Sequence, residues 1–288
     1  MSGGPPTVAL VHATSAAMAP ARSAFADRFP QARLWNLLDD RLISEAEAAG
    51  GLTPALRHRM QTLIRHAVDG GADAVLLSCS MYGPVAVEGA AGYPVPVLAS
   101  DQALFETVAE HVACQDRHSG RARRVAVLRP IRAGVDDTVA RLRDRLAGEE
   151  VALTGTVVDG VHAAAGDLSQ LVPLVVDAAR RVEPSADVIV LGQFSISPAQ
   201  PAVQAAVDVP VLSPTHLAAD VLRARLITAG AARGPRPARS PWVVWPTTTP
   251  AAPTSRPRCA APVCAPSCCS ASPTRSSRCR TATRWSSH

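Results

Sequence analysis

The chain has 288 residues, all 29 of its basic residues are Arg, and its formal net charge is +5. Without a lysine amine it cannot form a Schiff base with pyridoxal phosphate or a carbonyl substrate, and it has no phosphate-loop lysine. The excess charge lies after residue 230, where nine Arg stand without an acid, so residues 1–230 carry 20 Arg against 24 acids, a balance of −4.

Up to residue 230, short β-branched segments alternate with amphipathic stretches, which is typical of βα units around a mostly parallel sheet. The clearest helix is expected over Pro54–Val68, with Thr53 as its N-cap. Two more are expected over Gln102–Cys114 and Leu217–Ala229. The predicted strands are Thr7–Ala13, Ala32–Leu37, Ala74–Ser78, Val95–Ala99, Arg124–Leu128, Val151–Val157, Val188–Leu191 and Val209–Leu212.

An internal repeat appears when the chain is aligned with itself. At an offset of 114 residues, Ala72–Cys79 falls on Ala186–Gln193, and Val95–Leu98 falls on Val209–Leu212. A repeat of this length indicates a duplicated domain. We therefore predict an α/β fold of two similar Rossmann-like parallel-sheet halves, residues 1–115 and 116–230, related by pseudo-twofold symmetry, with strand exchange between them left open. Because ligands bind beyond the carboxyl ends of parallel strands, the active site is expected in the cleft between the halves.

The composition changes after residue 230. Residues 231–288 contain ten Pro and show no amphipathic period, so they cannot bury enough apolar surface to offset their ordering entropy. We expect this tail to be disordered. Its mixture of Arg, Pro, Ser, Ala and Cys is what GC-rich DNA yields when it is read out of frame, which is one interpretation, and a Pro/Arg-rich interaction tail is the other.

Cys79 follows an apolar strand, in the segment Leu76–Pro84 with its small hydroxyl residues and Gly83. At such a position, free backbone N–H groups can bind an anion and lower the pKa of a thiol. Cys79 is therefore a candidate acid, base or nucleophile, although a cysteine in an apolar segment is more often part of the core.

Four segments of residues 7–230 carry a family resemblance: His12–Ser15 after the first strand, Leu77–Ser80, Val95–Leu98, and Leu191–Ser195 in the second half. Together they resemble the aspartate/glutamate/hydantoin racemase superfamily. The resemblance implies an isomerase without metal or organic cofactor, in which a cysteine from each half works on opposite faces of a carbon next to a carboxylate. It implies that Cys79 is catalytic and that the substrate contacts come from His12, Thr14, Ser15, Ser80, Met81, Tyr82, Gln193, Phe194 and Ser195.

The chain departs from this pattern at Gln193, where the second cysteine should stand. A carboxamide does not exchange protons near neutral pH, so the two-thiol mechanism is unavailable. His216, just past the last predicted strand, is our candidate for the missing catalytic group, and His12 is a second one. For each of these two histidines, a structural role or simple surface exposure is the commoner case.

Four interpretations of the site stay open. Cys79 could racemise or epimerise a substrate together with a non-cysteine group. It could instead protonate the product of a decarboxylation, as in the related arylmalonate decarboxylase, whose cysteine lies in the other half. A third reading is addition to a double bond, as in maleate isomerase. The last is a binding protein for small carboxylates that has lost the chemistry.

Two arginines follow the first strand of the second half. Arg129 or Arg132 could pair with a second carboxylate of the substrate, although a surface arginine explains either one as well.

We expect a small carboxylate as the ligand and neither a nucleic acid nor a membrane as partner, while a homo-oligomer stays open. Aromatic residues make up 3% of the chain, and no basic stripe follows the predicted elements. No apolar run approaches the roughly 18 residues of a membrane span. The N-terminus lacks the basic segment of a signal peptide, so a cytoplasmic protein is expected.

Overall fold

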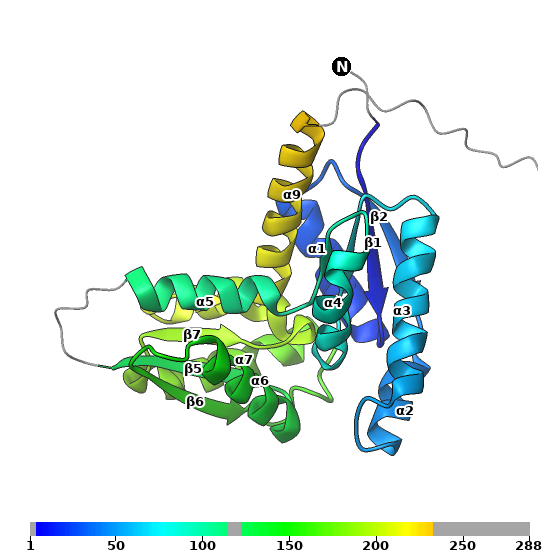
Figure 1. The fold of residues 1–288 in the computed structure, drawn as a ribbon. Coiled ribbons are helices and arrows are strands. Elements are labelled where there is room, and N and C mark those ends of the chain that lie inside the picture. The colour runs from blue at the N-terminus through cyan, green and yellow to red at the C-terminus, as the bar shows by residue number, and fades with distance from the viewer. Residues whose placement is uncertain (1–3, 115–121, 233–288) are drawn as a thin grey trace, which may run out of the picture. The chain divides into compact units, whose positions relative to one another are not determined.

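Two four-stranded parallel sheets organise the chain, of which the computed structural model describes residues 4–114 and 122–232 (Figure 1). The first sheet has the order β2-β1-β3-β4 and the second the order β6-β5-β7-β8. All strands of a sheet come from the same half of the sequence. The strands are β1 (Thr7–His12), β2 (Arg33–Leu38), β3 (Ala74–Leu77), β4 (Val97–Leu98), β5 (Arg123–Arg129), β6 (Val151–Val157), β7 (Val188–Leu191) and β8 (Val211–Leu212).

Corresponding strands pair in the same way in the two sheets. Val8 pairs with Ala74 in the first sheet, as Val125 pairs with Val188 in the second. Strands β3 and β7 are buried along their whole length, which explains why both read as unbroken aliphatic runs. The predicted α/β fold of two similar parallel-sheet halves is confirmed.

An aspartate closes the start of each sheet in the same way. Asp73 Oδ2 accepts a hydrogen bond from the backbone N–H of Thr7 at 2.8 Å, and Asp187 Oδ2 accepts one from the N–H of Arg124 at 2.9 Å. Each aspartate precedes the third strand of its half and holds the first strand beside it. This contact gives the Ala-Asp pair of the sequence repeat a structural role.

Strands β4 and β8 are shorter than the sequence predicted, because a proline precedes each one. Pro96 and Pro210 were expected inside strands, but proline has no N–H to donate to a sheet. Their carbonyl groups still accept bonds, from Val75 and Ile189 respectively, at 2.9 Å. The regular strands therefore begin only after the prolines.

Helices surround both sheets. The predicted helix after Thr53 is confirmed as α3, where Thr53 Oγ1 accepts a hydrogen bond from the N–H of Leu56 at 3.3 Å. The described helices are α1 (Met18–Arg28), α2 (Arg41–Ala48), α3 (Pro54–Asp69), α4 (Gly83–Gly89), α5 (Gln102–Cys114), α6 (Arg132–Arg145), α7 (Leu168–Val182), α8 (Gln200–Ala206) and α9 (Pro214–Ala232), with 3-10 turns that include η1 (Ser15–Ala17), η2 (Ser80–Tyr82) and η6 (Phe194–Ala199).

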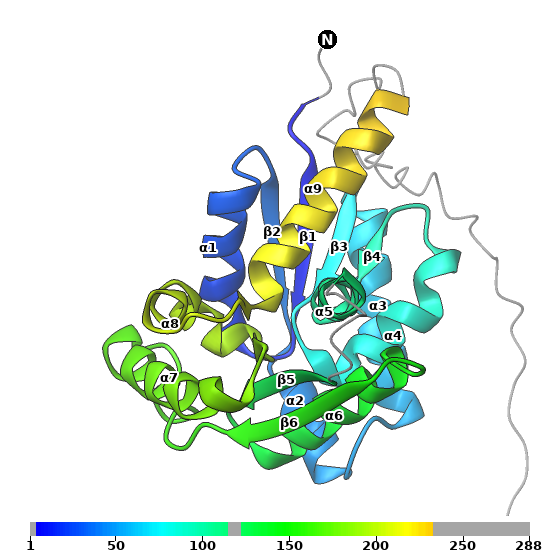
Figure 2. The same cartoon turned by 90° about the vertical axis from the view of Figure 1, so that its left-hand side faces the viewer.

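The last helix of each half packs on the other half. Helix α9 lies beside α1, and its Ala218 and Leu222 share a core cluster with β1 and β3 (Figures 1 and 2). Helix α5 packs Leu104 and Val108 against β5, β7 and α6. The halves therefore exchange helices and keep their own strands. Burial of these apolar faces fixes the halves against each other.

The tail predicted over residues 231–288 lies almost wholly outside the described residues. Within the described ranges, none of the helices is both long and apolar enough to cross a membrane.

The two aspartates give a test of the duplication. We expect Asp73→Ala and Asp187→Ala each to lower the free energy of unfolding by about 1–2 kcal/mol, because a partly buried backbone N–H loses its acceptor and, for Asp187, the ion pair with Arg124 is lost as well. Urea denaturation measures the change, with the exposed Glu149→Ala as control. Variants as stable as the control would show that these bonds do not hold the first strands.

Candidate active site at the ends of β3 and β7

Cys79 occupies the turn between β3 and η2, directly beyond the carboxyl end of a fully buried strand. Its side chain is half-buried and packs against the core cluster of the first half. The thiol is free. The backbone N–H groups of Met81 and Tyr82, at the start of the following helical segment, lower the pKa of this thiol, and the N–H of Tyr82 donates to the carbonyl of Cys79 at 3.2 Å. The strand thus places the thiol at the start of a helical segment, where backbone N–H groups gather.

Opposing effects act on the pKa of Cys79. Burial raises the pKa of this thiol above its ordinary value, and it outweighs the N–H groups of Met81 and Tyr82 and the positive charge of Arg129, which lower it. The carboxylate of Asp101 adds to the increase. The resting group is therefore mainly the thiol, which is the proton-donating form.

Arg129, the last residue of β5, crosses from the second half to the turn after Cys79. Its side chain is 4% exposed. Nη2 donates to Ser80 Oγ at 3.0 Å and to Gln193 Oε1 at 3.2 Å, and Nη1 donates to Thr138 Oγ1. One nitrogen thus joins residues that follow β3 and β7, so the two strand ends meet at this guanidinium.

Two glycines leave room for this arginine. A Cβ on Gly192 would lie 2.9 Å from Cγ of Arg129 and 3.0 Å from its Cδ. A Cβ on Gly134, in α6, would lie 2.9 Å from Nε. Both distances are shorter than side-chain packing allows, so glycine is required at these positions by the buried arginine. Gly192 takes the place that Ser78 has in the first half.

Gln193, the counterpart of Cys79 in the repeat, accepts a hydrogen bond from Arg129. Its amide carries no exchangeable acid or base near neutral pH. At the position of the expected second thiol, the chain therefore has an uncharged acceptor that helps to hold an arginine.

His12 is part of a buried row of hydrogen bonds across β1, β2 and β3. Its Nδ1 lies 2.8 Å from Ser78 Oγ and its Nε2 lies 3.1 Å from Asn36 Oδ1. Since Oδ1 can only accept, Nε2 carries the proton and Nδ1 accepts from the hydroxyl. Burial lowers the pKa of His12, and the bond to Asn36 offsets this only in part. The neutral, fully buried imidazole of His12 therefore uses both of its ring nitrogens in hydrogen bonds to Ser78 and Asn36.

His216 lies in the first turn of α9, because that helix begins at Pro214, three residues before the predicted start. Its Nε2 is 3.3 Å from Asp27 Oδ2 of α1. Its Nδ1 is buried without a partner among the described residues. The contact that holds the ring therefore lies on α1, and the catalytic role expected for His216 stays a prediction.

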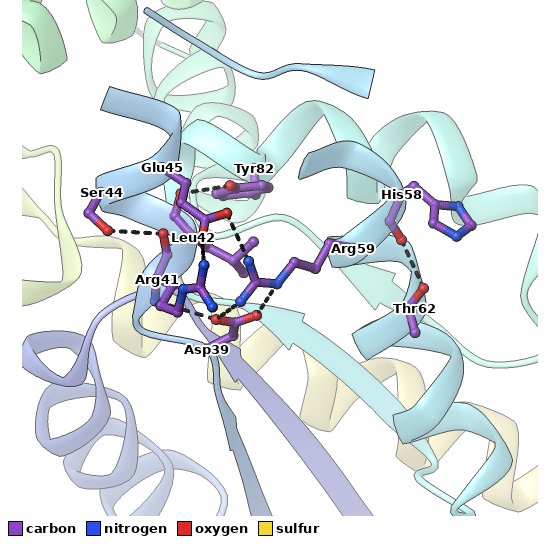
Figure 3. Close-up of polar contacts among 9 residues, drawn as sticks. All are labelled: Asp39, Arg41, Leu42, Ser44, Glu45, His58, Arg59, Thr62 and Tyr82. Carbon is purple, nitrogen blue, oxygen red and sulfur yellow. Dashed lines mark hydrogen bonds and ion pairs between the residues drawn. The ribbon is translucent and has the colours of Figure 1, made fainter. Parts of the chain in front are cut away.

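Tyr82 is fully buried, and its hydroxyl donates to the carbonyl of Leu42 at 2.9 Å. Figure 3 shows this bond beside an ion cluster in which Arg59 binds Asp39 and Glu45, at 2.6 and 2.9 Å. Burial raises the pKa of Tyr82 to about 12. The hydroxyl thus ties the helical segment after Cys79 to α2, and the substrate contact expected of Tyr82 stays a prediction.

The other residues expected to contact the substrate differ in exposure, from exposed to buried in the core. Thr14 caps η1, where its hydroxyl accepts from the N–H of Ala16 at 3.4 Å, while Ser15 is exposed. Met81 and Ser195 are partly buried. Phe194 is 2% exposed and packs in the core cluster formed by β1, β3, α1 and α9. The turn after β7 thus anchors the second half in the first through Phe194.

Sequence reasoning considered Arg129 and Arg132 together, and the structure separates them. The side chain of Arg132 is 67% exposed and lies 4.0 Å from Asp136, whereas Arg129 is buried and binds Ser80, the residue after Cys79. In the sequence, Gly134 and Gly192, together with Ser80 and Gln193 in the turns after β3 and β7, could have indicated this site. In the described ranges, no three His, Cys, Asp or Glu side chains are grouped so that they could hold a metal ion.

Comparison with known proteins supports the fold alone. No protein-family model and no curated protein matches the chain. The structure of allantoin racemase from Klebsiella pneumoniae matches with a TM-score of 0.58 and 14% identity, over 78% of this chain and 89% of that one. Picrophilus torridus aspartate racemase gives 0.57 and 13%, over 78% and 94%. Glutamate racemase from Thermus thermophilus gives 0.55 and 14%, over 80% and 83%. The fold expected from the resemblance is thereby confirmed.

The space around Arg129 gives a second test. We expect Gly192→Ala to lower the free energy of unfolding by about 1–3 kcal/mol, because the new methyl group displaces a buried side chain that cannot move freely. Thermal or urea unfolding measures the loss. Gly92→Ala is the matched control, since a Cβ there meets nothing within 4 Å. Equal stability of the two variants would contradict the buried position of Arg129.

Proposed function

We propose that the chain is an enzyme that transfers a proton at a carbon next to a carboxylate, without a cofactor, and that Cys79 is its acid–base group. The observation that carries this proposal is the place of Cys79, directly after β3 and against the N–H groups of Met81 and Tyr82. The likeness in fold to racemases of aspartate and glutamate supports the same chemistry.

The chemistry follows from the groups around the thiol. Removing a proton next to a carboxylate puts negative charge on the carboxylate oxygens, so the intermediate needs nearby N–H or O–H donors. The N–H groups beside Cys79 and the Ser80 hydroxyl are donors of this kind. The thiol supplies the proton, and its thiolate removes one. The leading candidate reaction is isomerisation at such a carbon.

A second candidate is decarboxylation, followed by protonation of the carbanion by Cys79. Isomerisation needs a second proton-exchanging group on the other face of the carbon, whereas decarboxylation needs only one acid. The bond between Gln193 and Arg129 favours this candidate, since neither group exchanges protons near neutral pH. His12 and His216 are both held by other side chains.

Replacing the thiol tests the proposal. We expect Cys79→Ala and Cys79→Ser to lower turnover by about 100-fold or more, because general acid–base catalysis is lost. Aspartate, glutamate, allantoin and an arylmalonate are the trial substrates. Reactions in heavy water are followed by NMR for deuterium at the carbon and by carbon dioxide release, with Cys114→Ala as the control cysteine variant.

The two signals separate the candidates. Deuterium at the carbon without carbon dioxide supports isomerisation, and carbon dioxide release with one deuteron incorporated supports the lyase. Full turnover in Cys79→Ala would refute the role of the thiol. A wild-type protein that binds a carboxylate without turning over any trial substrate would support a binding protein instead.

A further inference from the structure

Arg129 is a buried cation whose hydrogen-bond partners among the described residues are all neutral. A guanidinium carries five N–H groups, and three of them donate here, to Ser80, Gln193 and Thr138. Nε has no partner among the described residues. A buried charge normally has an ion-pair partner, because its desolvation is otherwise uncompensated. The surroundings of Arg129 therefore leave its charge available to an anion.

The acids nearest to Arg129 belong to another arginine. Asp101 and Asp137 both act on its charge, but Arg141 binds Asp101 through both of its terminal nitrogens and lies 3.6 Å from Asp137. Arg141 also stacks over Phe105, with its guanidinium carbon 5.0 Å from the ring centre. These contacts fix the acids in place, so they do not turn to Arg129.

We propose that Arg129 is the electrostatic partner of Cys79, held at the ends of β3 and β7 by Ser80 and Gln193, and that its charge stabilises the thiolate. This inference rests on the proposed function, in which Cys79 alternates between thiol and thiolate. The chain thus has a fixed positive charge where a second thiol was expected. Arg129 acts on the reacting sulfur without exchanging a proton itself.

Gln193 suits this role better than an acidic residue would. The amide oxygen accepts the bond from Nη2 at 3.2 Å and carries no charge. A carboxylate at the same place would form an ion pair with Arg129 and cancel its field at the sulfur. Gln193 is accordingly a positioning residue, and its neutrality is the property that matters.

Other groups around Cys79 also change the pKa of its thiol, some against Arg129 and some with it. Asp101, which follows the neighbouring strand β4, disfavours the thiolate. Tyr82 is neutral and its hydroxyl points to Leu42. The N–H groups of Met81 and Tyr82 act in the same direction as Arg129. Without the arginine, the backbone N–H groups of Met81 and Tyr82 would be left, in the described part of the chain, to offset the burial of the sulfur.

The test is the pH dependence of Cys79 alkylation by iodoacetamide, which reacts with the thiolate. Isotope-labelled reagent and mass spectrometry report on this residue alone, because cleavage before aspartates releases the fragment from Asp73 to Ser100, in which Cys79 is the sole cysteine. The full-length wild type is compared with Arg129→Gln. The control is Arg132→Gln, which removes an exposed arginine three residues away.

We expect Arg129→Gln to slow alkylation at pH 7 by about tenfold or more and to move the midpoint of the pH profile upward, while Arg132→Gln follows the wild type. Gln193→Glu is the second variant, since it keeps the size of the side chain and the arginine. Its carboxylate should move the profile in the same direction, so the inference stays testable if Arg129→Gln does not fold.

Unchanged profiles in the folded variants would overturn the inference, and so would an equal shift in Arg132→Gln. None of these outcomes bears on Cys79 itself. The turnover of Cys79→Ala decides the proposed function separately, so a failure of either idea can be recognised on its own.

Discussion

The buried guanidinium of Arg129 is the interaction on which the site depends. It extends from the end of β5 to Ser80 after β3 and to Gln193 after β7, and thereby brings the working ends of both sheets to one point. A desolvated charge in this place imposes requirements on its surroundings. Gly192 must lack a side chain, and residue 193 must be an acceptor. Several features of the second half are thus consequences of one charge.

The duplicated architecture holds the two halves in the positions that the contacts of Arg129 require. Each half builds its own sheet with the same register, and each places its last helix on the other half. The exchange of α5 and α9 buries apolar surface between the halves, and Phe194 adds a side chain from the turn after β7. A hydrogen bond of about 3 Å across the site is therefore supported by a large core rather than by loops.

The sequence predicted the eight strands, three of the main helices and the duplication. Strands and helices follow from the local spacing of apolar residues, and the duplication follows from the alignment of the chain with itself. It also identified Cys79, whose place after a buried strand is a local property. It could not predict the exchange of α5 and α9, since both possible packings bury the same apolar faces. Nor could it tell that Arg129 is buried while Arg132 is exposed, because that difference depends on Gly134 and Gly192, far apart in the chain.

The central claim is that one thiol serves the site and that the group opposite to it is a fixed charge. The most direct measurement is deuterium exchange from heavy water, followed by NMR at the carbon next to the carboxylate, in the wild type, Cys79→Ala and Arg129→Gln. Our account predicts that the wild type introduces deuterium, that Cys79→Ala does not, and that Arg129→Gln does so more slowly. Exchange at the wild-type rate in Cys79→Ala or in Arg129→Gln would contradict the account.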